Sequence, residues 1–191
     1  MELIKPCKDL GKEFHDFVEH SIQARDLDIS SNAKIYLVGV LVNFSTSGNI
    51  LNEYDSPLTF KLHESMNEKN KIVKIGKLQD IGDLCLFLTG YFPDYIQKKG
   101  EGQIDYHIGI GSTAYKAAGE FFGADDVLYK ELSEKFPNLR LVVGDLRPRE
   151  LYNNLSLDEL YERWKRTRDS YESSLLINKG VIPIIGNDDL N

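Results

Sequence analysis

The fold of this chain is decided by residues 72–91, which read IVKIGKLQDIGDLCLFLTGY. Apolar side chains recur there at helical spacing over about five turns, at Ile72, Ile75, Leu78, Ile81, Cys85, Leu88 and Tyr91. Gly76, Gly82 and Gly90 weaken the helical preference locally. Pro93 should end or kink the helix, because its ring removes a backbone hydrogen bond and clashes with the preceding turn. The spacing therefore predicts one long helix at the centre of the fold.

The segments around this stretch also favour helices, which are predicted over residues 9–27, 33–44, 57–69, 104–122 and 125–136. Residues 33–44 are apolar on nearly all sides, which fits either a buried helix or a central strand, and the helical neighbours favour the helix. The pair Ser56-Pro57 is typical of a helix start. The pattern of residues 139–143 fits either a strand or a helix.

The last helix has the clearest start signal. Ser156 and Glu159 form a capping box, in which each side chain satisfies a backbone N–H of the first turn. The buried face of this helix is predicted to carry Leu157, Leu160, Trp164, Tyr171 and Leu175. Gly180 should stop it, so that residues 180–191 form an extended tail. We expect an all-α single domain over residues 1–191, a compact bundle of about six to seven helices.

Composition limits the class of protein. The chain has 191 residues, 41% hydrophobic and 28% charged, which is enough apolar material to build a core. Its formal net charge of -7 argues against a protein that coats nucleic acid. No secretory signal or membrane-spanning run is present, so a cytoplasmic location is expected, with Cys7 and Cys85 as free thiols.

Named motifs of catalysis and cofactor binding are weak. Residues 109–114 read GIGSTA and have the G-x-G-x-x-A form of a dinucleotide fingerprint, but the following segment has helical spacing where a strand is needed. Close helix packing through Gly111, Ala114 and Ala118 is the favoured interpretation. His15, Glu19 and His20 are interpreted as a solvated helix face. We therefore predict neither a cofactor nor a metal, and a non-catalytic protein is favoured over an enzyme.

The first candidate site is a concentration of arginine near the C-terminal third. The predicted contact residues are Arg147, Arg149, Arg163, Trp164, Arg166 and Arg168, with Arg140 in the same stretch. Planar guanidinium groups beside aromatic rings favour binding of carboxylate, phosphate or a protein surface. The alternative is a self-paired helix face, with Glu159 four residues before Arg163 and Glu162 four before Arg166. The preferred hypothesis is a protein that binds a protein partner or itself through this region.

The second candidate site consists of polar residues in apolar surroundings, Asp83, Tyr91, Tyr106, His107 and Tyr115. A buried carboxylate must be paired or must change its pKa, and a tyrosine hydroxyl or a histidine would serve as its partner. These residues predict a pocket between two helices for a small apolar or aromatic ligand or cofactor, with acid–base chemistry at His107 left open. The alternative is a satisfied buried polar network.

Overall fold

The computed structural model describes residues 10–46, 57–123, 126–147 and 155–183, and every regular element in these ranges is an α-helix. The helices there are α1 (Leu10–Ala24), α2 (Ser31–Thr46), α3 (Leu58–Met66), α4 (Lys71–Tyr91), α5 (Pro93–Gln97), α6 (Gln103–Phe122), α7 (Val127–Glu134), α8 (Phe136–Gly144), α9 (Leu157–Thr167) and α10 (Ser170–Asn178). The predicted all-α fold is confirmed, although these ten helices exceed the predicted number. The excess comes from the short helices α5 and α8 and from a break in the last helix.

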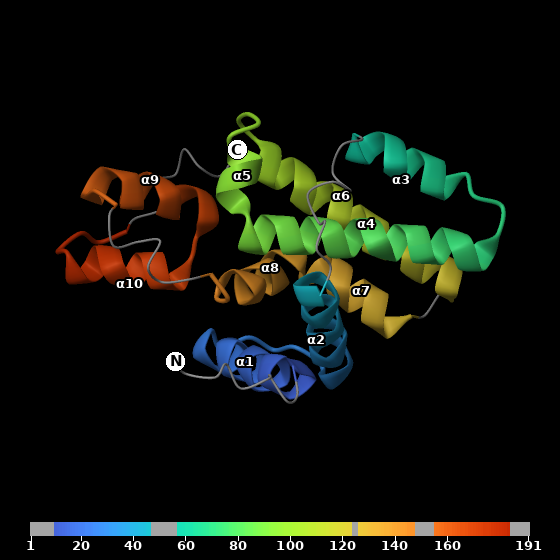
Figure 1. The fold of residues 1–191 in the computed structure, drawn as a ribbon, viewed down its shortest axis with the longest axis horizontal. Coiled ribbons are helices and arrows are strands. Elements are labelled where there is room, and N and C mark those ends of the chain that lie inside the picture. Colours follow the sequence, from blue (N-terminus) through green and yellow to red (C-terminus); the bar gives the residue numbers. More distant parts are fainter. Residues whose placement is uncertain (1–9, 47–56, 124–125, 148–154, 184–191) are drawn as a thin grey trace, which may run out of the picture.

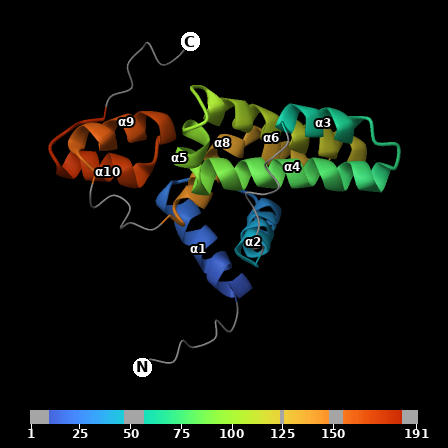
Figure 2. The same ribbon diagram turned by 45° about the horizontal axis from the view of Figure 1, so that its top comes forward.

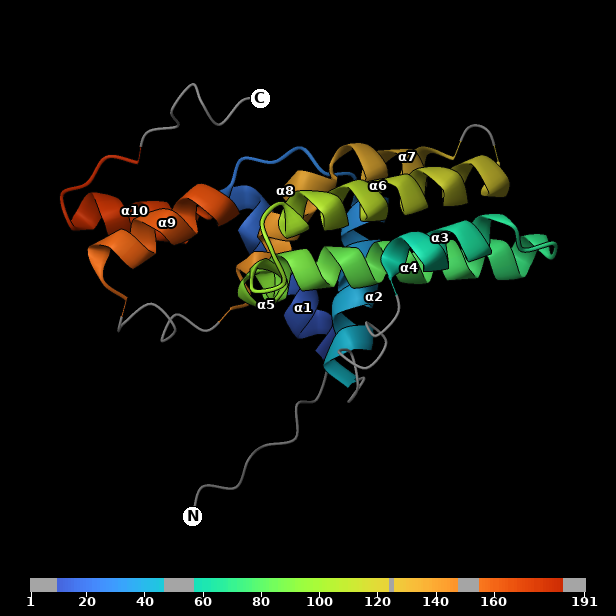
Figure 3. The ribbon, with the colours of Figure 1, turned by 90° about the horizontal axis from the view of Figure 1, so that it is seen from above.

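Helices α4 and α6 lie antiparallel at the centre of the molecule (Figure 1), joined by α5 and a short turn. Helix α3 packs along α4, and α7 and α8 run back along the central pair (Figure 3). Helices α1 and α2 pack together and lie on one side of this layer (Figure 2). The predicted central helix is confirmed: α4 begins after Asn70, whose side chain accepts hydrogen bonds from the N–H groups of Ile72 and Val73.

Two glycines allow the central helices to approach their neighbours closely. A methyl group at Gly111 would lie 2.5 Å from the ring of Phe136 and 2.8 Å from Cβ of Cys85. A methyl group at Gly82 would lie 2.5 Å from the ring of Tyr115. Such contacts are well below van der Waals distance, so any larger residue would push the helices apart. The small-residue packing predicted for α6 is therefore present at Gly111.

Helices α9 and α10 lie at one end of the molecule and have a small core of their own, formed by Leu160, Trp164 and Leu176. The prediction that Leu157 lies on the buried face was wrong, because this first residue of α9 is 39% exposed. The predicted capping box is confirmed, because the Ser156 hydroxyl accepts from the N–H of Glu159 and the Glu159 carboxylate accepts from the N–H of Ser156.

The prediction of one continuous C-terminal helix was wrong. Arg168 ends α9 in the left-handed conformation, with φ 55°. Asp169 then starts α10 by accepting hydrogen bonds from the N–H groups of Tyr171 and Glu172. Aspartate is one of the strongest N-cap residues. Asp169 therefore starts a new helix, although the apolar spacing continues across this position.

Two ambiguous segments are settled as helices. Residues 33–44 lie within α2 and residues 139–143 within α8, so the strand alternatives were wrong. Ser56 falls outside the described residues, and so do residues 184–191, which make up most of the predicted tail. None of the helices that the structure describes is long and apolar enough to cross a membrane.

Candidate functional site

A carboxylate shared by two tyrosines lies where α2, α4 and α6 meet. The hydroxyl of Tyr36 donates to Oδ1 of Asp83 at 2.7 Å, and the hydroxyl of Tyr115 donates to the same oxygen at 2.7 Å. The two rings meet edge to face with their centroids 6.0 Å apart, and Tyr129 from α7 lies beside both. The structure thus brings together Asp83 and Tyr115, two of the predicted pocket residues.

Local sequence explains why these groups meet. Gly82 has no side chain, and this leaves the space that the ring of Tyr115 occupies next to Asp83. Tyr115 is fully buried and is also in contact with the ring of Phe136, so its hydroxyl has a fixed position. A tyrosine hydroxyl in such a position requires a hydrogen-bond acceptor, which Asp83 supplies.

The environment of Asp83 disfavours its ionised form. Burial raises the pKa of Asp83 to about 6, against an ordinary value of 3.8, and the nearby Asp80 adds to the rise, while the two tyrosine hydrogen bonds act in the opposite direction. Burial and the Asp83 charge in turn raise the pKa values of Tyr36 and Tyr115. Both phenols therefore stay protonated and act as hydrogen-bond donors. No lysine, arginine or histidine among the described residues lies within 4 Å of this carboxylate.

Asp83 also lines a groove of about 450 Å³ between α2, α3 and α4. Its apolar lining residues are Phe44, Ile81 and Leu84. Its charged lining residues are Lys61, Glu64, Lys77, Asp80 and Asp83, so acidic groups outnumber basic ones. Lys77 is already paired with Glu68 at 3.1 Å and lies 3.9 Å from Glu64. A volume of this size is in the range of small-molecule sites.

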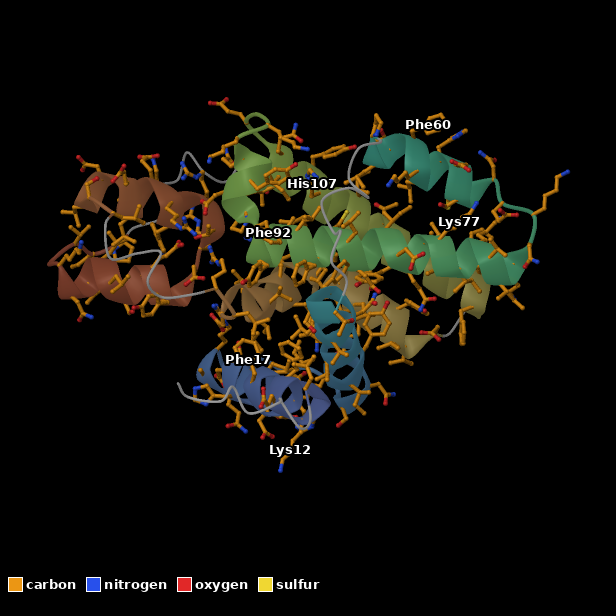
Figure 4. All side chains as sticks on the ribbon, in the orientation of Figure 1. Lys12, Phe17, Phe60, Lys77, Phe92 and His107 are labelled. Carbon is orange, nitrogen blue, oxygen red and sulfur yellow. The ribbon has the colours of Figure 1, made fainter. Side chains whose placement is uncertain are left out.

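The other predicted pocket residues lie in different surroundings. His107 is fully buried in α6, where its Nδ1 contacts the carbonyl oxygen of Gln103. Figure 4 shows His107 near the α5 end of the central pair, whereas Lys77, which lines the groove, lies toward the opposite end. Tyr106 accepts a hydrogen bond from the N–H of Thr59 at 3.2 Å, and Tyr91 stacks on Phe87.

Part of the Arg-rich region is directed into the protein. Arg163 is 8% exposed; its Nε donates to Oε1 of Glu172 at 2.7 Å, and its Nη1 lies 2.5 Å from Oδ2 of Asp94. Arg147 is 6% exposed, and its Nη2 donates to Oδ2 of Asp169 at 2.6 Å. These ion pairs attach α9 and α10 to α5 and to the end of α8.

The remaining predicted contact residues differ in exposure. Trp164 is buried, and the Arg168 guanidinium lies over its ring at 4.8 Å from the centroid. Arg166 is exposed, and Glu162 pairs with Lys165 at 2.7 Å. Arg149 lies outside the described residues.

The sequence did not point to Tyr36 or Tyr129 as parts of the site. Helix α2 is apolar on nearly all sides, so its pattern carries no signal of which face meets α4. Its single tyrosine in an apolar run was a usable signal, because a buried phenol needs an acceptor and the chain offers few buried carboxylates.

An asparagine at position 83 is expected to stabilise the protein at neutral and alkaline pH. The folded-state pKa of Asp83, about 6, lies above its unfolded value near 3.8, so ionisation costs stability above pH 6 and costs nothing below about pH 4. A difference of about two pKa units corresponds to on the order of 3 kcal/mol. In Asp83→Asn the amide oxygen still accepts both phenol hydrogen bonds.

Urea unfolding at pH 8 should therefore show Asp83→Asn to be roughly 1–3 kcal/mol more stable than the wild type, with no gain at pH 4. Asp80→Asn, which changes an exposed carboxylate one turn earlier, is the matched control and should show a smaller change. A clear loss of stability in Asp83→Asn at pH 8 would mean that the ionised carboxylate supports the fold.

The structure places the dinucleotide-like motif and the histidines of the first helix on helices α6 and α1. Residues 109–114 lie within α6 with no strand before them, so the dinucleotide context is absent. His15 and His20 are exposed on α1, and Glu19 pairs with Lys34 at 2.8 Å. In the ranges that the structure covers, no three metal-binding side chains are grouped together. In comparisons with known proteins, no family model, curated protein or solved structure matches this chain.

Proposed function

We propose that the protein binds a small organic cation in the groove beside Asp83, with an ammonium group against the carboxylate and an apolar body against Phe44, Ile81 and Leu84. One observation carries this proposal: Asp83 is largely buried at the edge of the groove, and no cation of the described residues lies within 4 Å of it. A buried charge without an opposite charge is costly, and a ligand that supplies one relieves the cost.

The hydrogen-bond geometry supports a receptor for a cation. Both phenols donate to Oδ1, which leaves Oδ2 without a hydrogen-bond partner among the described residues. The two donors fix the carboxylate in orientation before any ligand arrives, so little ordering has to accompany binding. The groove lining carries more carboxylates than lysines, and this excess favours cations.

The proposal is tested by calorimetric titration with benzylamine and, as its neutral counterpart, benzyl alcohol. We expect benzylamine to bind at pH 8 with a dissociation constant in the millimolar range, as for a fragment of this size, and benzyl alcohol to bind at least about tenfold more weakly. Asp83→Asn should abolish this preference.

Leu157→Ala, an exposed position on α9 far along the chain from the groove, is the matched control and should bind benzylamine like the wild type. Equal affinity for the amine and the alcohol, or unchanged amine binding in Asp83→Asn, would contradict the proposal.

As a second candidate, we propose that the exposed part of α9 and α10 contacts a second copy of the chain or another protein. The observation in its favour is that Arg166 is exposed and that Leu157 and Ile177 are exposed apolar side chains, 39% and 57% accessible. Arg147 and Arg163 are assigned to the fold and not to this contact, because both are buried in ion pairs.

Light scattering over a wide concentration range tests self-association. The wild type should associate at high concentration, Arg166→Glu should stay monomeric, and Lys98→Glu, another exposed cation, should behave like the wild type. A wild type that stays monomeric at every concentration would contradict self-association, and equal association of Arg166→Glu would exclude a role for Arg166.

A further inference from the structure

A second hollow, of about 420 Å³, lies where the turn after α5, the start of α6, α8 and α9 meet. Four cationic side chains line it, Arg140 from α8 and Lys165, Arg166 and Arg168 from the end of α9, against two carboxylates, Glu101 and Asp105. Lys165 is paired with Glu162 at 2.7 Å, and the three arginines still outnumber the two lining carboxylates, although the whole chain is acidic. Arg166 is exposed and provides an accessible edge.

Arg140 is the unusual member of this group. Its residue is 8% exposed, and its Nη2 donates to the carbonyl oxygen of Thr167 at 3.2 Å, but its Nε has no hydrogen-bond partner in the part of the chain that the structure describes. Within that same part, no carboxylate lies within 4 Å of its guanidinium. Burial, the largest influence, lowers the pKa of Arg140, and the charge of Asp105 opposes this effect. Buried guanidinium groups are normally paired with an acceptor, so the unpartnered Nε of Arg140 makes this side chain suited to bind an anion.

The start of α6 adds a second source of positive potential. Gly102, Ile104 and Asp105 line the hollow at the N-terminus of this helix of 20 residues. The N-cap residue is Gly102 in the left-handed conformation, and it has no side chain to cap the first-turn N–H groups. A helix N-terminus carries a partial positive charge and free N–H donors, both of which attract anions.

We infer that this hollow binds the phosphate group of a small phosphate monoester, gripped by Arg140 and Arg166 beside the N-terminus of α6. A phosphate group offers several charged oxygens and can accept from both guanidinium groups at once, which suits Arg140 and Arg166 better than a single carboxylate does. The volume exceeds that of a phosphate group alone and leaves room for a small esterified part. The site is separate from the groove at Asp83, whose lining residues come from α2, α3 and α4.

Calorimetry with inorganic phosphate, glycerol phosphate and acetate, at equal ionic strength, tests this inference. Phosphate and glycerol phosphate should bind the wild-type protein, and acetate should bind at least about tenfold more weakly. Arg166→Gln and Arg140→Gln should each weaken phosphate binding by about tenfold or more. Lys98→Gln, which removes a nearby exposed cation that does not line the hollow, should leave phosphate binding unchanged.

Three results would overturn the inference: no phosphate binding by the wild type at millimolar concentrations, equal binding by Arg166→Gln, or acetate bound as tightly as phosphate. Arg166 is exposed, so Arg166→Gln gives an answer even if Arg140→Gln fails to fold. Asp83→Asn should bind phosphate like the wild type. Loss of benzylamine binding in this variant therefore tests the groove at Asp83 without affecting the test of the phosphate site.

Discussion

Replacing Arg163 with methionine is expected to lower the free energy of unfolding of the α9–α10 unit by about 3–5 kcal/mol. Methionine fills much of the same volume but leaves the fully buried carboxylate of Glu172 without its 2.7 Å partner. Arg147 also lies near Glu172, but its Nη1 is 3.7 Å from the carboxylate, beyond hydrogen-bond distance. The Thr167 hydroxyl donates to the same carboxylate but has no charge to compensate it. The core of these two helices is small, so the ion pairs make a large share of their attachment.

Hydrogen exchange of the α9 and α10 amides, together with urea unfolding, measures this effect. The amides of both helices should lose protection in Arg163→Met, while those of α4 and α6 keep theirs. Arg166→Met on the exposed side of the same helix is the control and should change stability by less than about 0.5 kcal/mol. The double variant Arg163→Met, Glu172→Gln should recover part of the loss, because the buried charge is then removed as well. Similar protection in Arg163→Met and Arg166→Met would contradict this role.

Replacing Gly90 with alanine is expected to destabilise the whole bundle by about 2–3 kcal/mol. A methyl group there would lie 2.6 Å from the carbonyl oxygen of Arg140 and 2.6 Å from Cβ of Val143. One of these contacts is with backbone, which cannot rotate out of the way, so α8 would have to move away from α4. That movement would also disturb the hollow that Arg140 lines.

Gly76→Ala provides a matched control in the same helix. Nothing lies within 4 Å of a methyl group at Gly76, so only the helix propensity changes, by up to about 1 kcal/mol in favour of alanine. Thermal unfolding should therefore shift in opposite directions for Gly90→Ala and Gly76→Ala. A stabilised Gly90→Ala would show that α4 and α8 are not in close contact.

The parts of the fold that the sequence predicts are those with local causes. The apolar period of residues 72–91 and the capping box of Ser156 and Glu159 each act within a few turns of one helix, and both appear in the structure. The break at Arg168 was missed because the apolar spacing continues across it, although Asp169 is a good N-cap. Helix α5 was missed because a single turn after Pro93 has too few residues to show a period.

The candidate sites depend on contacts between residues that are far apart in the sequence. The sequence predicts only some of these contacts. A partner hydroxyl for Asp83 was predicted and Tyr115 provides one, yet Tyr36 lies 47 positions away on a helix without a polar face. The arginine cluster was recognised, but spacing along one helix cannot show that Arg163 turns toward Glu172 on the next helix. Exposed and buried members of such a cluster look the same in a sequence.

The most direct test of the account is an NMR titration of the Asp83 carboxyl group with and without benzylamine. Asp83 should have a pKa of about 6 in the free protein, and saturating benzylamine should lower this pKa by about one unit or more, because a cation that binds the carboxylate favours its ionised form. A pKa near 4 in the free protein, or a pKa that benzylamine leaves unchanged, would contradict it.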